Sequence, residues 1–157
     1  MGRGIELVSL EEANSISSVW CTLSTQFNPA LNDIQEEFDG LIEKIHRFGT
    51  TVASFDEGRL AGAISFYSND AVTHEAYVSL LAVLPSWRRK GIGSLLLRRA
   101  ELISARSGMS RIRLEVRVDN PTARAFYLHM GYVELGCGSP GFVSMCRDLM
   151  TERDGLE

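Results

Sequence analysis

Apolar and polar residues follow one another along this chain in patterns that predict a mixture of strands and helices. The clearest alternation runs from Arg111 to Val118, where every second residue is apolar, as expected for a strand with one buried face. An almost unbroken apolar run from Ala76 to Pro85 is instead typical of a central strand that is covered on both faces. A helix is predicted from Gly91 to about Ser107. Its apolar stripe would hold Ile92, Leu95, Leu96, Ala100 and Ile103, and its polar side Ser94, Arg98 and Glu101.

The remaining segments predict further short elements. Strands are expected at residues 5–8, 50–55, 59–67, 133–136 and 142–149, and helices up to about residue 23, after residue 33 and after residue 121. Ser9 and Glu12 have the spacing of a capping box, and Asn32 or Asp33 is expected to cap the second helix. Gly58 lies in the turn of a predicted hairpin, where glycine adopts a positive φ at little cost. The tail from Thr151 is expected to fray.

Composition places the chain among ordinary globular proteins. It has 157 residues, of which 45% are hydrophobic and 23% charged, and this suits one domain spanning residues 1–157. No apolar stretch is long enough to cross a bilayer and the amino terminus lacks a secretory signal, so we expect a cytoplasmic protein with no membrane partner. The three cysteines are odd in number and lack metal-ligand spacing, so we expect reduced thiols and no metal site.

A basic segment with two glycines, at the start of the third predicted helix, is the strongest candidate for ligand binding. The whole chain carries a net charge of -4, yet the stretch from residue 86 to 99 holds no acidic residue and five basic ones: Arg88, Arg89, Lys90, Arg98 and Arg99. Helix amino termini present unpaired N–H groups to anions, and glycines let a phosphate approach the backbone closely. A Walker loop requires a glycine followed by a lysine, but here Lys90 precedes its glycine. A dinucleotide-binding fingerprint requires a third glycine or an alanine at position 96, which is Leu96. A purely structural glycine turn is the alternative.

Two motifs in this half of the chain resemble those of a known enzyme family. Residues 88–93 fit the pattern Arg/Gln-x-x-Gly-x-Gly after a strand, which resembles the pyrophosphate-binding motif of the GCN5-related N-acetyltransferases (GNAT). Asn120, Ala123, Tyr127 and Gly131-Tyr132 read N-x-x-A-x-x-x-Y-x-x-x-G-Y, which looks like the second signature of that family. The resemblance covers about residues 76–132. Within the family, LEVRVDN at residues 114–120 is weakly similar to the ribosomal-protein alanine N-acetyltransferases.

The resemblance implies a fold and an activity. The fold would be α/β (α+β), a single domain with a mixed, mostly antiparallel sheet of about seven strands flanked by about four helices. The activity would be transfer of an acetyl group from acetyl-CoA to a primary amine of a small molecule or of a peptide amino terminus. A catalytically silent domain of the same fold, binding acyl-CoA as a sensor, is the alternative. The basic cluster is short and would serve the cofactor, so no nucleic-acid partner is expected. The acceptor and the oligomeric state, including a homodimer, stay open.

The resemblance also assigns catalytic roles. Tyr127 resembles the general acid that protonates the leaving thiolate, and Glu115 resembles the base proposed for the ribosomal-protein enzymes. Against the second role, Arg113 and Arg117 lie on the same strand face as Glu115 and would favour a surface ion-pair network. Glu75 is the fallback base.

Binding roles follow from the same resemblance. A backbone N–H within Leu81, Ala82 and Val83 would stabilise the oxyanion. The cofactor would further contact Arg88, Arg89, Lys90, Gly91, Ile92, Gly93, Ser94, Asn120, Ala123 and Tyr127. A plain helix cap is the alternative role for Asn120. The acceptor would contact Phe27, Asn28, Tyr67 and Tyr77, with packing as the alternative role for Phe27.

Overall fold

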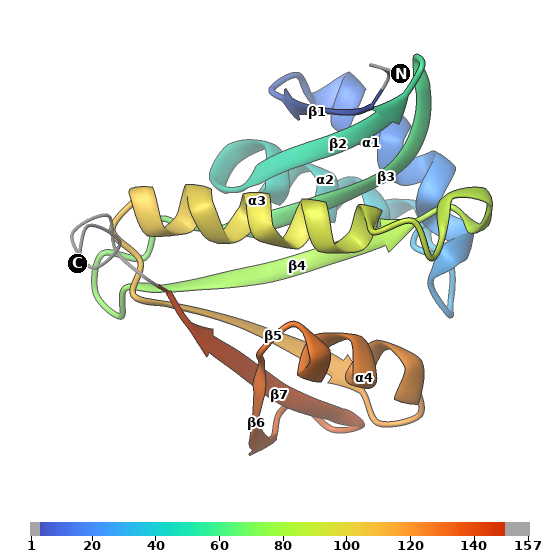
Figure 1. Ribbon diagram of the computed structural model, residues 1–157. Helices are drawn as coiled ribbons and strands as arrows, with labels where there is room; N and C mark the ends of the chain where they lie inside the picture. Colours follow the sequence, from blue (N-terminus) through green and yellow to red (C-terminus); the bar gives the residue numbers. More distant parts are fainter. Residues whose placement is uncertain (1–3, 150–157) are drawn as a thin grey trace. The chain divides into compact units, whose positions relative to one another are not determined.

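The computed structural model describes residues 4–149, and their secondary structure follows the predicted order (Figure 1). The strands are β1 (Ile5–Leu10), β2 (Thr50–Asp56), β3 (Arg59–Tyr67), β4 (Glu75–Val83), β5 (Arg111–Arg117), β6 (Val133–Cys137) and β7 (Phe142–Asp148). The α-helices are α1 (Ala13–Leu23), α2 (Gln35–Phe48), α3 (Ile92–Arg106) and α4 (Pro121–His129), with short 3-10 helices η1 (Ser24–Gln26) and η2 (Pro85–Trp87). The tail from Thr151 lies outside the described residues. Within those residues, no helix has both the length and the apolar character needed to cross a membrane.

Hydrogen bonds join the strands into one sheet in the order β1-β2-β3-β4-β5-β7-β6. The pairs β1–β2, β2–β3, β5–β7 and β6–β7 are antiparallel, whereas β4 and β5 pair in parallel. The mixed, mostly antiparallel sheet and the four α-helices of the described residues confirm the predicted fold class. The described residues divide into two compact units, the first with residues 4–67 and 79–100, the second with residues 68–78 and 101–149.

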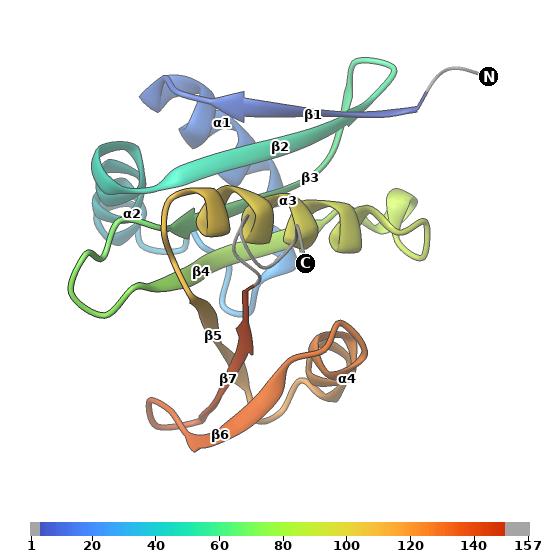
Figure 2. The same ribbon diagram turned by 60° about the vertical axis from the view of Figure 1, so that its left-hand side comes forward.

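The first unit has its main core between helices α1 and α2 and one face of β2 and β3. Large helix side chains pack against small strand residues in a cluster that includes Trp20, Leu23, Phe38, Ile45, Ala53 and Ala63. The buried indole of Trp20 donates a hydrogen bond to Ser65 Oγ at 2.9 Å, and Ser65 Oγ lies 2.6 Å from Thr51 Oγ1. These bonds satisfy polar atoms that would otherwise be costly to bury. Figures 1 and 2 show the first half of α3 on the opposite face of these strands.

The second unit is built on β5, β7 and β6, with α4 beside them (Figure 2). The predicted alternation along β5 is confirmed, because Ile112, Leu114 and Val116 are buried while the residues between them are partly exposed. Val118 was expected to extend the buried face, but it follows the end of β5 and is 55% exposed.

Two predictions about burial are wrong. β4 does not have two covered faces, since alternate residues from Ala76 to Ala82 are buried and those between them are partly exposed. On α3, Leu95 is exposed while Leu97 is fully buried, and Glu101 is buried rather than solvated. Because residues 95–97 are three consecutive leucines, two adjacent stripes along the helix fit the apolar periodicity. The periodicity alone therefore does not predict which stripe is buried.

Two predicted helix caps are also wrong. Ser9 lies within β1, opposite Val52, and α1 begins after Glu12 without a side-chain cap. Helix α2 begins after Ile34, again without one. The side chain of Asn32 instead accepts a hydrogen bond from Ser24 Oγ at 2.6 Å, so this residue holds the loop before α2 rather than the helix itself.

Candidate functional site

The turn that leads into α3 carries the basic segment predicted to bind an anion. Residues 88–91 connect η2 to α3, which begins at Ile92. Arg89 and Gly91 both have positive φ, 63° and 79°. When residues with left-handed backbone conformation alternate with right-handed ones in a turn, successive backbone N–H groups point to the same side. This arrangement, called a nest, binds anions. Gly91 adopts this conformation without the strain that a Cβ would cause.

Aromatic and charged side chains of the first unit fix the residues just before this turn. The indole of Trp87 donates a hydrogen bond to Asp56 Oδ2 at 3.1 Å. The guanidinium of Arg59 lies 5.2 Å from the centre of the Trp87 ring, within the range of a cation–π contact. The start of the turn is therefore tied to the hairpin between β2 and β3.

Arg88 also braces the turn, although the sequence predicted a cofactor contact for it. Its Nε donates to the carbonyl oxygen of Val83 at 3.2 Å, and its Nη2 donates to Gln26 Oε1. Two of its nitrogens are thus engaged with the protein. Arg89 and Lys90 are exposed beside it.

The end of β4 holds the backbone positions expected to stabilise an oxyanion. In the described residues, the pairing of β4 with β5 stops at Tyr77 and Arg113. Leu81, Ala82 and Val83 lie beyond that point. Ala82 is buried, and the other two are partly exposed.

Asn120 caps the helix that carries the second predicted motif. Its Oδ1 accepts a hydrogen bond from the backbone N–H of Ala123 at 3.1 Å, and Pro121 occupies the first helical position, where no N–H is needed. Helix α4 ends at His129, and Gly131, which follows the C-cap residue Met130, has a φ of 96° that favours glycine. The structure therefore shows the cap role of Asn120, and it leaves the amide Nδ2 for another partner.

Tyr127 lies on α4 between two other aromatic rings. Its ring centre is 5.1 Å from that of Phe126 and 5.7 Å from that of Tyr132, both in edge-to-face geometry. Its hydroxyl makes no hydrogen bond to any other residue within 4–149. Burial raises the pKa of Tyr127 well above that of a free phenol, so this group stays protonated at neutral pH.

A buried polar cluster that the sequence did not predict lies behind Tyr127. Glu101 is only 6% exposed and accepts hydrogen bonds from Tyr132 Oη at 2.7 Å and from Arg147 Nη1 at 3.1 Å. Burial and the neighbouring Glu101 carboxylate raise the pKa of Tyr132. The cluster fixes the ring of Tyr132, and Tyr127 packs against that ring.

The side chain of Glu115, on β5, is bound by the loop between β6 and β7. Its carboxylate accepts hydrogen bonds from the backbone N–H of Ser139 at 2.9 Å and from Ser139 Oγ at 3.0 Å. A Cβ at Gly138 would lie 2.3 Å from Glu115 Oε2, so a larger residue there would require the carboxylate to shift. The predicted ion pairs of Glu115 with Arg113 and Arg117 are absent from the described residues.

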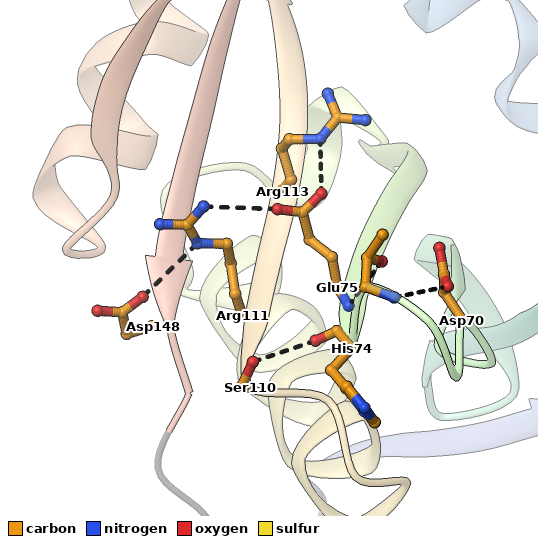
Figure 3. Close-up of polar contacts among 8 residues, drawn as sticks. Asp70, His74, Glu75, Ser110, Arg111, Arg113 and Asp148 are labelled. Atoms are coloured by element: carbon orange, nitrogen blue, oxygen red, sulfur yellow. Dashed lines mark hydrogen bonds and ion pairs between the residues drawn. The ribbon is translucent and has the colours of Figure 1, made fainter.

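Glu75, the fallback base, is occupied by two arginines (Figure 3). Its Oε1 lies 3.3 Å from Arg113 Nε and its Oε2 lies 3.5 Å from Arg111 Nη1. Arg111 also reaches Asp148 at 3.7 Å. Because both oxygens of Glu75 face guanidinium groups of β5, this carboxylate joins β4 to β5.

The residues predicted to contact the acceptor have different surroundings. Phe27 packs edge-to-face against Trp20, 6.2 Å between ring centres, and adjoins the core of the first unit, which supports a packing role. Asn28 is exposed in the following loop. The ring of Tyr67 lies 5.4 Å from Lys44 Nζ. Tyr77, in the second unit, lies under the guanidinium of Arg113 at 4.8 Å.

A match to a protein-family model identifies the family of this chain. A sequence model described as the acetyltransferase (GNAT) family matches residues 16–132. The chain belongs to the GNAT family. This confirms the resemblance and the enzyme class expected from it, at the level of the family.

Individual relatives agree with this family. The chain is 32% identical over 81 residues to the N-alpha-acetyltransferase MAK3 of Arabidopsis thaliana, an alignment covering 51% of this chain and 43% of that protein, less than half of its length. Among solved structures, Ard1 from Thermoplasma volcanium is 25% identical with a TM-score of 0.70, covering 92% of this chain and 97% of its own.

Two more distant structures show the same fold. PaiA N-acetyltransferase from Thermoplasma acidophilum, solved in complex with coenzyme A, is 20% identical with a TM-score of 0.71 and covers 92% of this GNAT chain and 99% of its own. The ribosomal-protein-S18-alanine N-acetyltransferase from Escherichia coli is 18% identical with a TM-score of 0.70, covering 93% and 94%.

Proposed function

We propose that this GNAT protein transfers an acetyl group from acetyl-CoA to a primary amine of a small molecule or of a peptide amino terminus. The observation that carries the proposal is the phenol of Tyr127, which occupies the family's second motif, stays protonated at neutral pH and has no hydrogen-bond partner within residues 4–149. A protonated phenol hydroxyl that is not engaged in a hydrogen bond within the protein is available as a general acid.

The turn before α3 fits the diphosphate of coenzyme A. The positive φ of Arg89 and Gly91 gives the turn the shape of an anion nest, and Arg89 and Lys90 place positive charge beside it. The N–H groups of residues 89–94 at the start of α3 would bind the phosphates. Acetyl-CoA, when bound, supplies an acetyl group activated as a thioester. Asn120 has its Nδ2 left for the pantetheine arm, with Ala123 next to it on the first turn of α4.

Two protein groups would move protons during transfer. The attacking amine must lose a proton, and Glu115 accepts it directly or through a water molecule. Tyr127 donates its proton to the departing thiolate. A backbone N–H within residues 81–83 would stabilise the negative charge that forms on the acetyl oxygen. Ser139 holds Glu115 in place, which supports the proposed base without occupying all of its acceptor positions.

The experiment combines turnover and binding. The protein is incubated with labelled acetyl-CoA and a panel of primary amines, and coenzyme A binding is measured by calorimetry. We expect acetylation of at least one amine, and we expect Tyr127→Phe to lower turnover about 10²-fold or more while affinity for acetyl-CoA changes little. Binding without turnover of any amine would favour the sensor, and unaltered turnover in Tyr127→Phe would remove the phenol from the mechanism.

A further inference from the structure

Three polar side chains share one face of the second unit. Tyr77 of β4 and Arg113 of β5 are register partners in the parallel pair, and Glu115 follows two residues after Arg113. Register partners and residues two apart project from the same face of a sheet, so the three side chains form one polar group on that face. We call this group the Tyr77–Arg113–Glu115 face.

Arg113 is held so that one end of its guanidinium stays open. Its Nε donates to Glu75 Oε1 at 3.3 Å, and the guanidinium lies over the ring of Tyr77 at 4.8 Å. Figure 3 shows its two terminal nitrogens directed away from Glu75 and Arg111. Within residues 4–149 these terminal nitrogens have no partner. A guanidinium held on one edge and one face presents a preorganised pair of donors, a geometry that matches a carboxylate.

The other two groups of the face also have free bonding capacity. The carboxylate of Glu115 takes two hydrogen bonds from Ser139 and can accept more. The hydroxyl of Tyr77 forms no hydrogen bond within residues 4–149. Burial raises the pKa of Tyr77, Glu115 raises it further and Arg113 opposes this, so both charges act on the phenol. A guanidinium and a carboxylate that can both bind further groups therefore act on one neutral phenol.

We propose that the Tyr77–Arg113–Glu115 face binds the acceptor, and that the acceptor is an amine that also carries a carboxylate, such as a free amino acid. This inference rests on the proposed acetyltransferase function. The terminal nitrogens of Arg113 bind the carboxylate, Glu115 faces the ammonium group and later takes its proton, and Tyr77 contacts the atoms between them. Such a ligand has both charges but no net charge, which matches a face with one open positive group and one open negative group.

The first test compares each amino acid with its primary amide in steady-state acetylation. We expect the amide, which lacks the carboxylate, to have a KM at least about tenfold higher in the unaltered protein. Arg113→Met should raise the KM of the acid to that of the amide, and Arg113→Lys should lose most of the preference because a lysine cannot form the two-pronged contact. Equal KM values for acid and amide in the unaltered protein, with turnover present, would overturn the inference and leave the acetyltransferase intact.

Arg111 provides the matched control. It pairs with the same Glu75 carboxylate, but its other contact is Asp148. Arg111→Met therefore removes an ion pair of the same network without removing the open guanidinium. We expect this variant to keep the preference for the acid. If Arg111→Met loses this preference as fully as Arg113→Met, the cause is a general disturbance of the strands and not the loss of a carboxylate site.

A binding measurement tests the same face without catalysis. Calorimetry with N-acetyl amino acids and their N-acetyl amides should show at least about tenfold tighter binding of the acids, and this difference should disappear in Arg113→Met. If no amine is turned over at all, the proposed function fails, and this measurement still decides whether the face binds carboxylates. Equal binding of acids and amides would refute the carboxylate site.

Discussion

The buried cluster of Glu101, Tyr132 and Arg147 predicts a measurable loss of stability when one hydroxyl is removed. In Tyr132→Phe the ring and its contact with Tyr127 remain, but Glu101 loses the donor at 2.7 Å. Glu101 is 6% exposed, so water cannot readily replace that donor. The substitution therefore isolates one hydrogen bond to a buried carboxylate.

The expected cost follows from the charge and burial of the acceptor. A hydrogen bond to a charged group contributes about 1.5–3 kcal/mol net, more than one between neutral groups. For a chain of this length each kcal/mol shifts Tm by about 2–4 °C, so Tyr132→Phe should lower Tm by about 3–12 °C. Arg147 still donates a hydrogen bond to Glu101 at 3.1 Å in this variant. Part of the negative charge of Glu101 therefore stays compensated, which limits the loss of stability to this range.

Equilibrium unfolding in urea, followed by tryptophan fluorescence, measures this cost directly. The same substitution is then made in a Glu101→Gln background, where the acceptor stays but the charge is gone. There Tyr132→Phe should cost only about 0.5–1.5 kcal/mol, and the difference between the two backgrounds is the coupling energy. An identical cost in both backgrounds would refute the claim that the ionised carboxylate is what the hydroxyl stabilises.

Two further pairs of substitutions separate structural from ligand-binding roles. Asn120→Ala should lose the cap to Ala123 and destabilise the protein by about 1 kcal/mol. Asn120→Asp should keep the cap and the stability but weaken coenzyme A binding, because aspartate lacks the Nδ2 donor. Equal affinity of Asn120→Asp and the unaltered protein in calorimetry would exclude the ligand contact. Gly91→Ala and Gly58→Ala place a Cβ at φ values of 79° and 81° in open space, so both should cost about 1–2 kcal/mol, but only Gly91→Ala should reduce coenzyme A affinity, as calorimetry on the pair would show.

The sequence predicted best where the cause of structure is local. The alternation along residues 111–117 and the turn at Gly58 depend on neighbouring residues, and the structure confirms both. The same holds for the cap of α4, where Asn120 precedes Pro121 by one residue. The failed caps at Ser9 and Asn32 also have local motifs, but there the tertiary structure prevails, because Ser9 is paired with β2 and Asn32 with Ser24.

Polar side chains were predicted poorly because their partners are distant in sequence. The sequence places Glu101 on the polar side of a helix, but its donors Tyr132 and Arg147 come from 31 and 46 residues further along the chain. Periodicity along α3 contains no information about them. For Glu115 the sequence offers ion pairs with its strand neighbours as the alternative to a role as the base, yet its hydrogen-bond partner is Ser139, 24 residues away.

Arg88 shows that a residue of the first motif can also have a structural role. Its Nε and Nη2 are directed to Val83 and Gln26, so the residue that defines the start of the first motif holds the turn in shape. Under the proposed function, backbone N–H groups of the turn would contribute to diphosphate affinity, and the positive φ of Arg89 and Gly91 sets their direction. Backbone dipoles are fixed in place before the ligand arrives, so binding requires no reorganisation of flexible charged side chains. The sequence indicated a charge cluster at this turn, and the structure adds that one member of the cluster, Arg88, is hydrogen-bonded within the protein.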